Sequence, residues 1–152
     1  MGKNIQNTLL KIARELNENE ISWALGGSLL IKLSNINTTV ADIDILVDEK
    51  DFQKLDELIK KYHFTYISKN KKYATSHFYT ITIDNVDIDI MVGFKIRTTN
   101  GIYSFPFKIT KEIVIDGEKI YLSSLKEWGK AYQLMDRTDK VKMLIKAGIT
   151  HD

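Results

Sequence analysis

Four aspartates form two short pairs whose spacing suits chemistry with a metal ion. Asp42-Ile43-Asp44 and Asp87-Ile88-Asp89 each place two carboxylates at positions i and i+2. On a β-strand, such residues project to the same face. Neighbouring carboxylates repel each other unless a cation or a proton neutralises them. Ligands that offer only oxygen favour a hard divalent cation such as Mg²⁺. A solvated strand end is the alternative interpretation of such a pair.

A glycine-rich turn precedes the first acidic pair. Gly26-Gly27-Ser28 follows an apolar run, residues 21–25, which predicts a short buried strand. Residues 29–33 predict a short helix with Ser28 as its N-cap. Glycines allow close approach of the backbone, and a helix N-terminus offers free N–H groups to phosphate. Alone, this motif fits a tight strand-to-helix turn equally well, and it lacks the Lys-Ser/Thr of a P-loop.

Hydrophobic periodicity predicts the elements that must position these residues. Apolar residues at helical spacing predict an amphipathic helix over residues 3–18, and strict alternation predicts a strand over residues 40–47. Asp84-Asn85 separates two β-rich runs and is typical of a two-residue hairpin loop, which would pair Thr80 with Asp89. The remaining expected elements are a helix over 52–59 capped by Asp48 or Asp51, strands over 64–67, 77–83 and 86–92, two short strands between 101 and 122, a helix opened by the capping box Ser124–Glu127, and a helix over 137–146.

Length and composition are those of an ordinary globular protein. The chain has 152 residues, of which 43% are hydrophobic, and its net charge is +2. This charge is too small to indicate binding to a long nucleic acid. Cysteine is absent, which excludes disulfides, thiolate metal sites and a cysteine nucleophile. No signal-peptide pattern or membrane-length apolar run is present, so we expect a cytoplasmic protein with no membrane partner.

The order of these motifs resembles the nucleotidyltransferase superfamily of DNA polymerase β. Gly27-Ser28 is followed after thirteen residues by Asp42-Ile43-Asp44 and then by an isolated acid on a later strand. Similar small bacterial members are the lincosamide and aminoglycoside nucleotidyltransferases, the minimal nucleotidyltransferases of toxin–antitoxin pairs and the abortive-infection toxins. The similarity covers residues from about 5 to 95. It extends more loosely to Arg137-Thr138-Asp139-Lys140, a helix start often found in these proteins.

The resemblance implies an α/β (α+β) fold, with a mixed β-sheet flanked by helices and a short C-terminal helical part. We expect one nucleotidyltransferase domain over residues 1–152, with a core of about 1–95 and a C-terminal extension with two helices, about 96–152. The implied reaction moves a nucleoside monophosphate from an NTP to a hydroxyl acceptor with release of pyrophosphate. A small-molecule acceptor is favoured over a protein or tRNA, and the oligomeric state is left open.

The resemblance also implies roles for individual residues. Asp42 and Asp44 would hold the Mg²⁺ bound to the nucleotide, and a third acid would complete a second metal site, with Mn²⁺ as a substitute. Asp89 is favoured over Asp87 as the third acid, because Met91 and Val92 after it match the family's apolar pair before a loop. The nucleotide-binding residues would be Gly26, Gly27, Ser28 and a basic residue.

One departure from the family pattern keeps alternatives open. Many small members place an arginine just before the first acid pair, where this chain has Asn37-Thr38-Thr39. Neutralisation of phosphate would then come from Lys32, Lys126 or Lys140, and Lys140 is chosen here. The missing arginine also leaves an alternative function, a partner-binding module of antitoxin type that keeps the fold with little or no catalysis.

Overall fold

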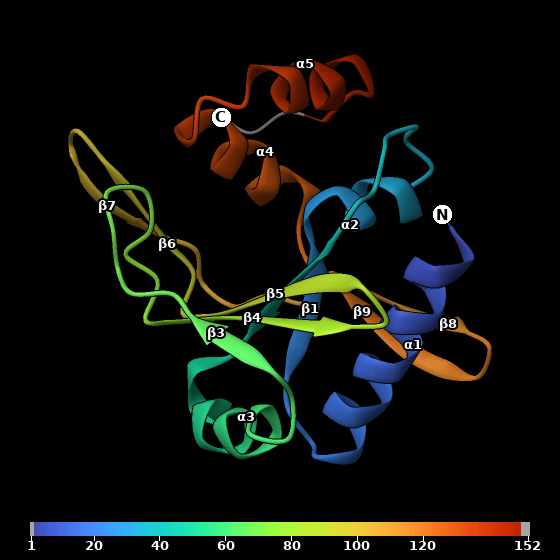
Figure 1. Ribbon diagram of the computed structural model, residues 1–152. Coiled ribbons are helices and arrows are strands. Elements are labelled where there is room, and N and C mark those ends of the chain that lie inside the picture. The colour runs from blue at the N-terminus through green and yellow to red at the C-terminus, as the bar shows by residue number, and fades with distance from the viewer. Residues whose placement is uncertain (1, 150–152) are drawn as a thin grey trace.

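A seven-stranded mixed sheet forms the centre of the molecule (Figure 1). The computed structural model describes residues 2–149. The strands lie in the order β3-β4-β5-β2-β1-β9-β8, and β2 pairs in parallel with β5 as β1 does with β9, while the other neighbours are antiparallel. The strands of this sheet are β1 (Trp23–Gly26), β2 (Ile43–Val47), β3 (Phe64–Tyr66), β4 (His77–Ile83), β5 (Val86–Val92), β8 (Lys111–Ile115) and β9 (Glu118–Leu122).

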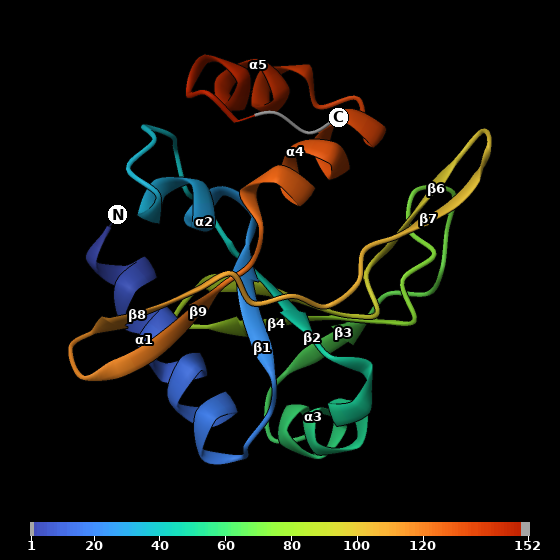
Figure 2. The same ribbon diagram turned by 180° about the vertical axis from the view of Figure 1, so that it is seen from behind.

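Helices lie on both sides of the sheet. In Figure 1 and in the reverse view of Figure 2, α1 and α3 lie on one side, and α2, α4 and α5 lie on the other. The helices are α1 (Lys3–Glu18), α2 (Gly27–Leu33), α3 (Phe52–Ile59), α4 (Leu125–Leu134) and α5 (Thr138–Lys146). A separate hairpin, β6 (Lys95–Thr98) with β7 (Gly101–Ser104), extends beyond the sheet as an arm. This confirms the expected mixed sheet flanked by helices.

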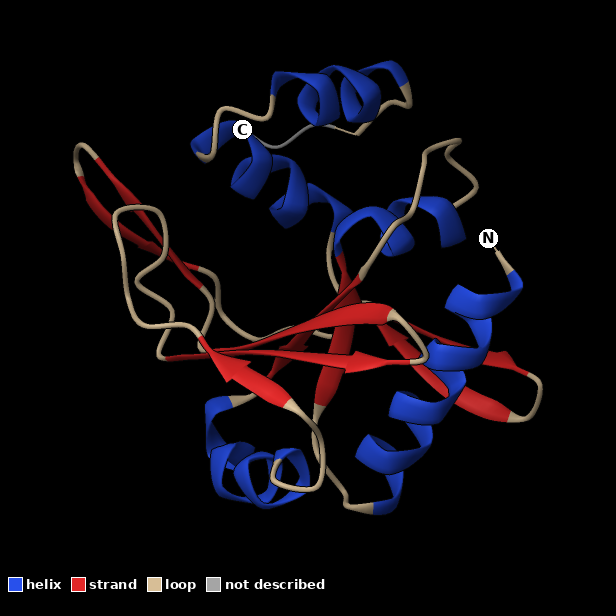
Figure 3. Cartoon of the chain, viewed as in Figure 1, coloured by secondary structure: helices blue, strands red, loops and turns tan. Residues whose placement is uncertain are grey.

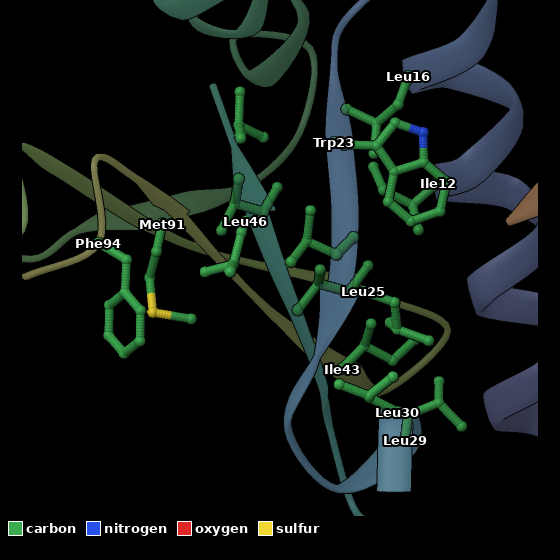
Figure 4. Packing of buried hydrophobic residues seen from close by; sticks show 14 of the residues in the cluster. Ile12, Leu16, Trp23, Leu25, Leu29, Leu30, Ile43, Leu46, Met91 and Phe94 are labelled. Atoms are coloured by element: carbon green, nitrogen blue, oxygen red, sulfur yellow. The ribbon is translucent and has the colours of Figure 1, made fainter. Parts of the chain in front are cut away.

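Alternation along β2 and β5 gives the sheet two different faces. Ile43, Ile45, Ile88 and Ile90 are fully buried and share one face, so the aspartates between them project from the other face. Figure 4 shows Leu46, Met91 and Phe94 on one side of β2, with Trp23, Ile12 and Leu16 beside α1 on the other side. The apolar cluster thus has a main part under α1 and α3 and a second part next to the acids.

The β4–β5 hairpin has the predicted geometry. Asp84 and Asn85 form its loop with φ of 52° and 65°, the left-handed conformation that a type I′ turn requires at both central positions. Ile83 therefore pairs with Val86, and Thr80 with Asp89. The predicted register is confirmed across the whole hairpin.

Three local predictions need correction. Ser28 is not the N-cap of α2, because Gly26 occupies that position without a side-chain hydrogen bond and Ser28 lies within the helix. The strand predicted over residues 40–47 begins at Ile43, so Asp42 lies in the loop that leads from α2 into β2 (Figure 3). Of the two predicted caps of α3, Asp51 occupies the N-cap position but makes no capping hydrogen bond with its side chain. Asp48 instead caps the short 3₁₀ helix Glu49–Asp51 that leads into α3, by accepting a hydrogen bond from the Lys50 N–H at 3.1 Å.

The region after β5 contains more strands than predicted. The strands expected around Asp116-Gly117 are present as β8 and β9, but β6 and β7 precede them, and no prediction covered β6. The β7 strand is exposed along its whole length and β8 is exposed at most positions, so neither carries a clear alternation of apolar residues. Ser124 is confirmed as the N-cap of α4, since its hydroxyl accepts a hydrogen bond from the Glu127 N–H at 3.1 Å. Among residues 2–149, no helix is both long enough and apolar enough to cross a membrane.

Candidate active site

Asp42, Asp44 and Asp89 line one pocket with a cavity of about 180 Å³. The parallel pairing of β2 with β5 places Asp44 directly beside Asp89. The Thr80 hydroxyl donates to Asp89 Oδ1 at 2.8 Å and fixes that carboxylate. Asp87 is exposed, accepts a hydrogen bond from Thr82 at 2.8 Å, and does not line the pocket. The structure therefore brings Asp89 to the first acidic pair and leaves Asp87 outside.

Two of these carboxyl groups, Asp44 and Asp89, have raised pKa values. Burial, together with the nearby charges of Asp42 and Asp89, raises the pKa of Asp44 to about 8, against the lowering influence of Lys140 and Arg137. Burial also raises the pKa of Asp89, although the Thr80 hydrogen bond opposes this and the charge of Asp42 adds to it. Perturbed carboxyl groups gathered in one pocket are typical of functional sites.

The donor set of this pocket fits a hard divalent cation. Carboxylate oxygens are the ligands that Mg²⁺ prefers, and a cation would offset the repulsion that raises the Asp44 pKa. Among the described residues, no three His, Cys, Asp or Glu side chains already form a cluster that could hold an ion.

The glycine turn lies against these acids and allows no side chain. Gly27 has φ of 62°, and a Cβ atom there would collide with the Asp44 carboxylate, whose Cγ would lie at 2.8 Å. A Cβ atom on Gly26 would overlap the Trp128 ring. The backbone therefore passes close to Asp44 only because both residues are glycine. Ser28 follows directly and lines the same pocket.

Two cationic side chains from the C-terminal helical part reach this turn. Lys140 Nζ donates to Ser28 Oγ at 2.9 Å and to Thr38 Oγ1 at 3.1 Å, so Lys140 lies in the predicted place. Burial, with a smaller contribution from the charge of Arg137, lowers the Lys140 pKa. Arg137 lines the pocket, although the sequence analysis assigned it no role beyond the family-like helix start.

None of the three lysines considered for neutralising phosphate, Lys32, Lys126 and Lys140, lines the pocket itself. Lys140 alone is hydrogen-bonded to a lining residue, Ser28. Lys72 does line the pocket, which sequence reasoning missed because Lys72 lies in a basic turn that is typical of a solvated loop. Its local sequence held no signal that this turn folds back towards the acids.

Aromatic residues of α4 form the opposite wall of the pocket. Trp128 and Tyr132 are each 5% exposed, and Trp128 Nε1 donates to Ser123 Oγ at 2.9 Å. Their spacing predicts packing against the sheet, and this is confirmed. Both also line the pocket that holds the acids, so the same side chains serve the core and the site.

The fold and the site together define the class of protein. A mixed sheet carrying a Gly-Gly-Ser turn, an Asp-x-Asp pair that lines a pocket and a third acid on the neighbouring parallel strand is the arrangement of a nucleotidyltransferase. The model of the aminoglycoside-2″-adenylyltransferase family matches residues 8–146. The chain therefore belongs to the aminoglycoside-2″-adenylyltransferase family, and it is a nucleotidyltransferase.

Solved structures agree with this assignment. A Thermotoga maritima protein assigned as a nucleotidyltransferase is 26% identical, with a TM-score of 0.73, over 93% of this chain and 90% of that one. The antibiotic-resistance factor ANT(2″)-Ia, in complex with adenylyl-2″-tobramycin, is 10% identical with a TM-score of 0.58, covering 93% and 87% of the two chains. The lincosamide adenylyltransferase LnuA, bound to lincomycin, is 16% identical with a TM-score of 0.54, covering 84% and 83%. No curated protein sequence matches the chain significantly.

The raised Asp44 pKa predicts how stability depends on pH without a divalent cation. The folded pKa, about 8, lies above the ordinary value of 3.8, so between these pH values the folded state holds a proton that the unfolded state releases. Asp44 therefore makes the free energy of unfolding decrease as pH rises from about 4 to about 8. Thermal denaturation in EDTA should show this decrease, and the Asp44→Asn variant should show less of it. An identical pH profile for both proteins would contradict the raised pKa.

Proposed function

We propose that this protein transfers a nucleoside monophosphate from a magnesium-bound NTP to the hydroxyl group of a small molecule in the cytoplasm. ATP is the expected donor, in agreement with the adenylyltransferase description of the family. The acceptor oxygen attacks the α-phosphorus, the bond between the α-phosphorus and the bridging oxygen breaks, and pyrophosphate leaves. The acceptor proton passes to a nearby base. The products are the phosphodiester and pyrophosphate.

The acids divide this work between binding and proton transfer. Asp42 and Asp44 would hold Mg²⁺, and Asp89 would contribute to a second ion site, with Mn²⁺ able to substitute. Bound Mg²⁺ would supply charge neutralisation at the phosphates and lower the pKa of the acceptor hydroxyl. Asp89, held by Thr80, is the base that takes the acceptor proton.

The Gly-Gly-Ser turn and Lys140 would hold the triphosphate. Backbone N–H groups at Gly26, Gly27 and Ser28 start a helix, where the dipole favours an anion. The two hydrogen bonds of Lys140 keep its ammonium group beside this turn. The phosphates would then lie between two groups: the N-terminus of α2 with Lys140 on one side, and the acids that would hold the cation on the other.

One observation carries the proposal: Asp42, Asp44 and Asp89 share a pocket with Arg137 and with Ser28, to which Lys140 donates a hydrogen bond. The test is calorimetric titration of Mg-ATP and the other Mg-NTPs into the wild-type protein and into Asp44→Asn. Binding by the wild-type protein and much weaker binding by the variant are expected. If millimolar nucleotide binds to neither protein, the proposal is wrong. The alternative of a partner-binding module predicts that acid-to-asparagine variants keep their full biological effect.

Replacing Lys140 with methionine should weaken nucleotide binding. The buried ammonium group lies beside Ser28, and loss of a charge-assisted contact to phosphate costs about 2 kcal/mol, or about 30-fold in affinity. Lys126→Met is the matched control, because Lys126 is exposed and outside the pocket. Isothermal titration with Mg-ATP compares the two variants. Equal affinities would remove Lys140 from the triphosphate site.

Asp89→Asn and Asp87→Asn should separate the two candidates for the third acid. Only Asp89 lines the pocket, although both aspartates lie on the same face of β5 and both accept a threonine hydrogen bond. We expect Asp89→Asn to lower the turnover number by about 10²-fold or more, the usual loss when a general base is removed. Asp87→Asn should stay within about twofold of wild type, since no role in chemistry is assigned to it. Initial rates of pyrophosphate release test this, and the reverse order would exchange the roles.

A further inference from the structure

The pocket leaves few carboxylates for recognising an acceptor. Asp42, Asp44 and Asp89 are its three acids, and the proposed function commits all three to cations and proton transfer. The charged residues that remain in the lining are Lys72 and Arg137, both positive. A polycationic sugar would need free carboxylates at the wall, so the charge pattern disfavours such an acceptor.

The surface next to the proposed base is apolar. Met91 follows Asp89 by two residues on the same face of β5, and its cross-strand partner on β4 is Phe78. Tyr73 packs edge-on against Phe78, with ring centroids 5.1 Å apart. If the acceptor's hydroxyl group lies at Asp89, the rest of the acceptor molecule therefore lies against the Met91 thioether and the aromatic rings of Phe78 and Tyr73.

A second cavity of about 280 Å³ lies beside this surface. Met91 and Phe94 line both this cavity and the catalytic pocket, so they form the shared wall. Leu46 and Phe107 line the cavity as well, and Phe105, which also lines it, stacks on Phe94 with centroids 4.9 Å apart. Figure 4 shows Leu46, Met91 and Phe94 together on the side of β2 away from α1.

The acids at the rim of this cavity already have partners. Glu49 accepts a hydrogen bond from the Ser76 hydroxyl at 3.0 Å and forms an ion pair with Lys95 at 3.4 Å. Asp48 caps the short helix through the Lys50 N–H. Lys95 thus offsets the charge of Glu49, while Asp48 forms no ion pair among the described residues. The rest of the cavity lining is mainly apolar, which favours an occupant with an apolar body.

We propose that the acceptor is an uncharged, ring-bearing alcohol. Its hydroxyl lies at Asp89, and its apolar body lies across Met91 and Phe94 in the second cavity. This inference rests on the proposed function and specifies the class of acceptor. In this transfer the alcohol oxygen bonds to the α-phosphorus, its proton goes to Asp89, and pyrophosphate leaves. Phe107 becomes a specificity-determining residue, since it lines this cavity but not the pocket that holds Asp42, Asp44 and Asp89.

Calorimetry with two kinds of probe tests this proposal. The protein is first saturated with Mg²⁺ and a non-hydrolysable ATP analogue, and then titrated with chloramphenicol or 2-naphthaleneethanol, both uncharged, or with tobramycin, a polycation. We expect at least one uncharged probe to bind at least tenfold more tightly than tobramycin. Phe107→Ala should weaken that binding about tenfold, while Phe107→Leu should largely restore it. Ile109→Ala is the control, because Ile109 is exposed and lies outside this cavity.

Several results would overturn the inference. Tighter binding of tobramycin, with a loss in Asp87→Asn, would indicate a cationic acceptor held by the exposed acid. If Phe107→Ala weakened the nucleotide instead of the probe, the cavity would hold the base. Failure of both uncharged probes, in samples that bind Mg-nucleotide, would reject the inference and leave the proposed function intact. Failure of the wild-type protein to bind Mg-nucleotide would reject both.

Discussion

Replacing Asp44 with asparagine is expected to lower nucleotidyl transfer by about 10³-fold or more, a loss typical for removal of one member of a catalytic unit. The apo protein should at the same time be at least as stable as wild type. Asp44 is the most perturbed acid of the site, since burial and its acidic neighbours raise its pKa to about 8. Asparagine keeps the shape and removes the charge. The variant therefore loses cation binding. Its apo state also no longer contains the repulsion between residue 44 and the neighbouring acids.

Two measurements on the same sample separate these effects. Pyrophosphate release with Mg-ATP reports catalysis, and thermal denaturation in EDTA at pH 7.5 reports the stability of the apo protein. Asp87→Asn is the matched control, because Asp87 is exposed and its replacement should change neither activity nor the stability of the apo protein. A variant that lost both activity and stability would show that Asp44 is structural, and one that kept activity would remove it from the site.

Gly27→Ala should also abolish most activity, for a steric reason. The added Cβ would collide with the Asp44 carboxylate, so the carboxylate must move. A displacement of about 1 Å at a reacting group costs about 10²-fold in rate. The left-handed backbone adds a penalty of about 1 kcal/mol to the stability of the alanine variant.

A second glycine isolates the steric part of this effect. Gly117 has φ of 81°, and a Cβ atom there would meet nothing within 4 Å. Gly117→Ala therefore carries the backbone penalty without the clash at the site. Urea denaturation should show similar losses of stability for both variants, while initial rates should fall only for Gly27→Ala. Equal rates in the two variants would contradict the close approach of the turn to Asp44.

Local sequence signals predicted the parts of the site that neighbouring residues determine. The two-residue loop at Asp84-Asn85 determines the register of β4 against β5, and hence the Thr80–Asp89 pair. The Asp-x-Asp spacing predicted one shared face. The preference for Asp89 over Asp87 as the third acid rested on family resemblance, and the geometry agrees, since only Asp89 lines the pocket. Its role in chemistry stays a prediction.

Features that depend on distant parts of the chain escaped sequence reasoning. The pairing of β2 with β5 joins Asp44 to Asp89 across a parallel crossover, and no local pattern determines which strands become neighbours. Arg137 and Lys72 reach the pocket from loops and helix starts whose sequences are typical of solvent-exposed segments. Ser28 was wrong as a cap because α2 begins at Gly27, so Ser28 lies inside the helix. Its hydroxyl accepts a hydrogen bond from Lys140, which lies 112 positions further along the chain. The division into a core and a C-terminal extension stays a prediction.

The central claim is that Asp42, Asp44 and Asp89 together hold the cations of a nucleotidyl transfer site. A crystal grown with Mn²⁺ and a non-hydrolysable ATP analogue tests it most directly, through the anomalous signal of manganese. The account predicts a peak coordinated by Asp42 and Asp44 and by the triphosphate, with Asp89 at the same or a second peak. Nucleotide bound without a peak at these carboxylates, or manganese bound at Asp87 instead, would contradict it.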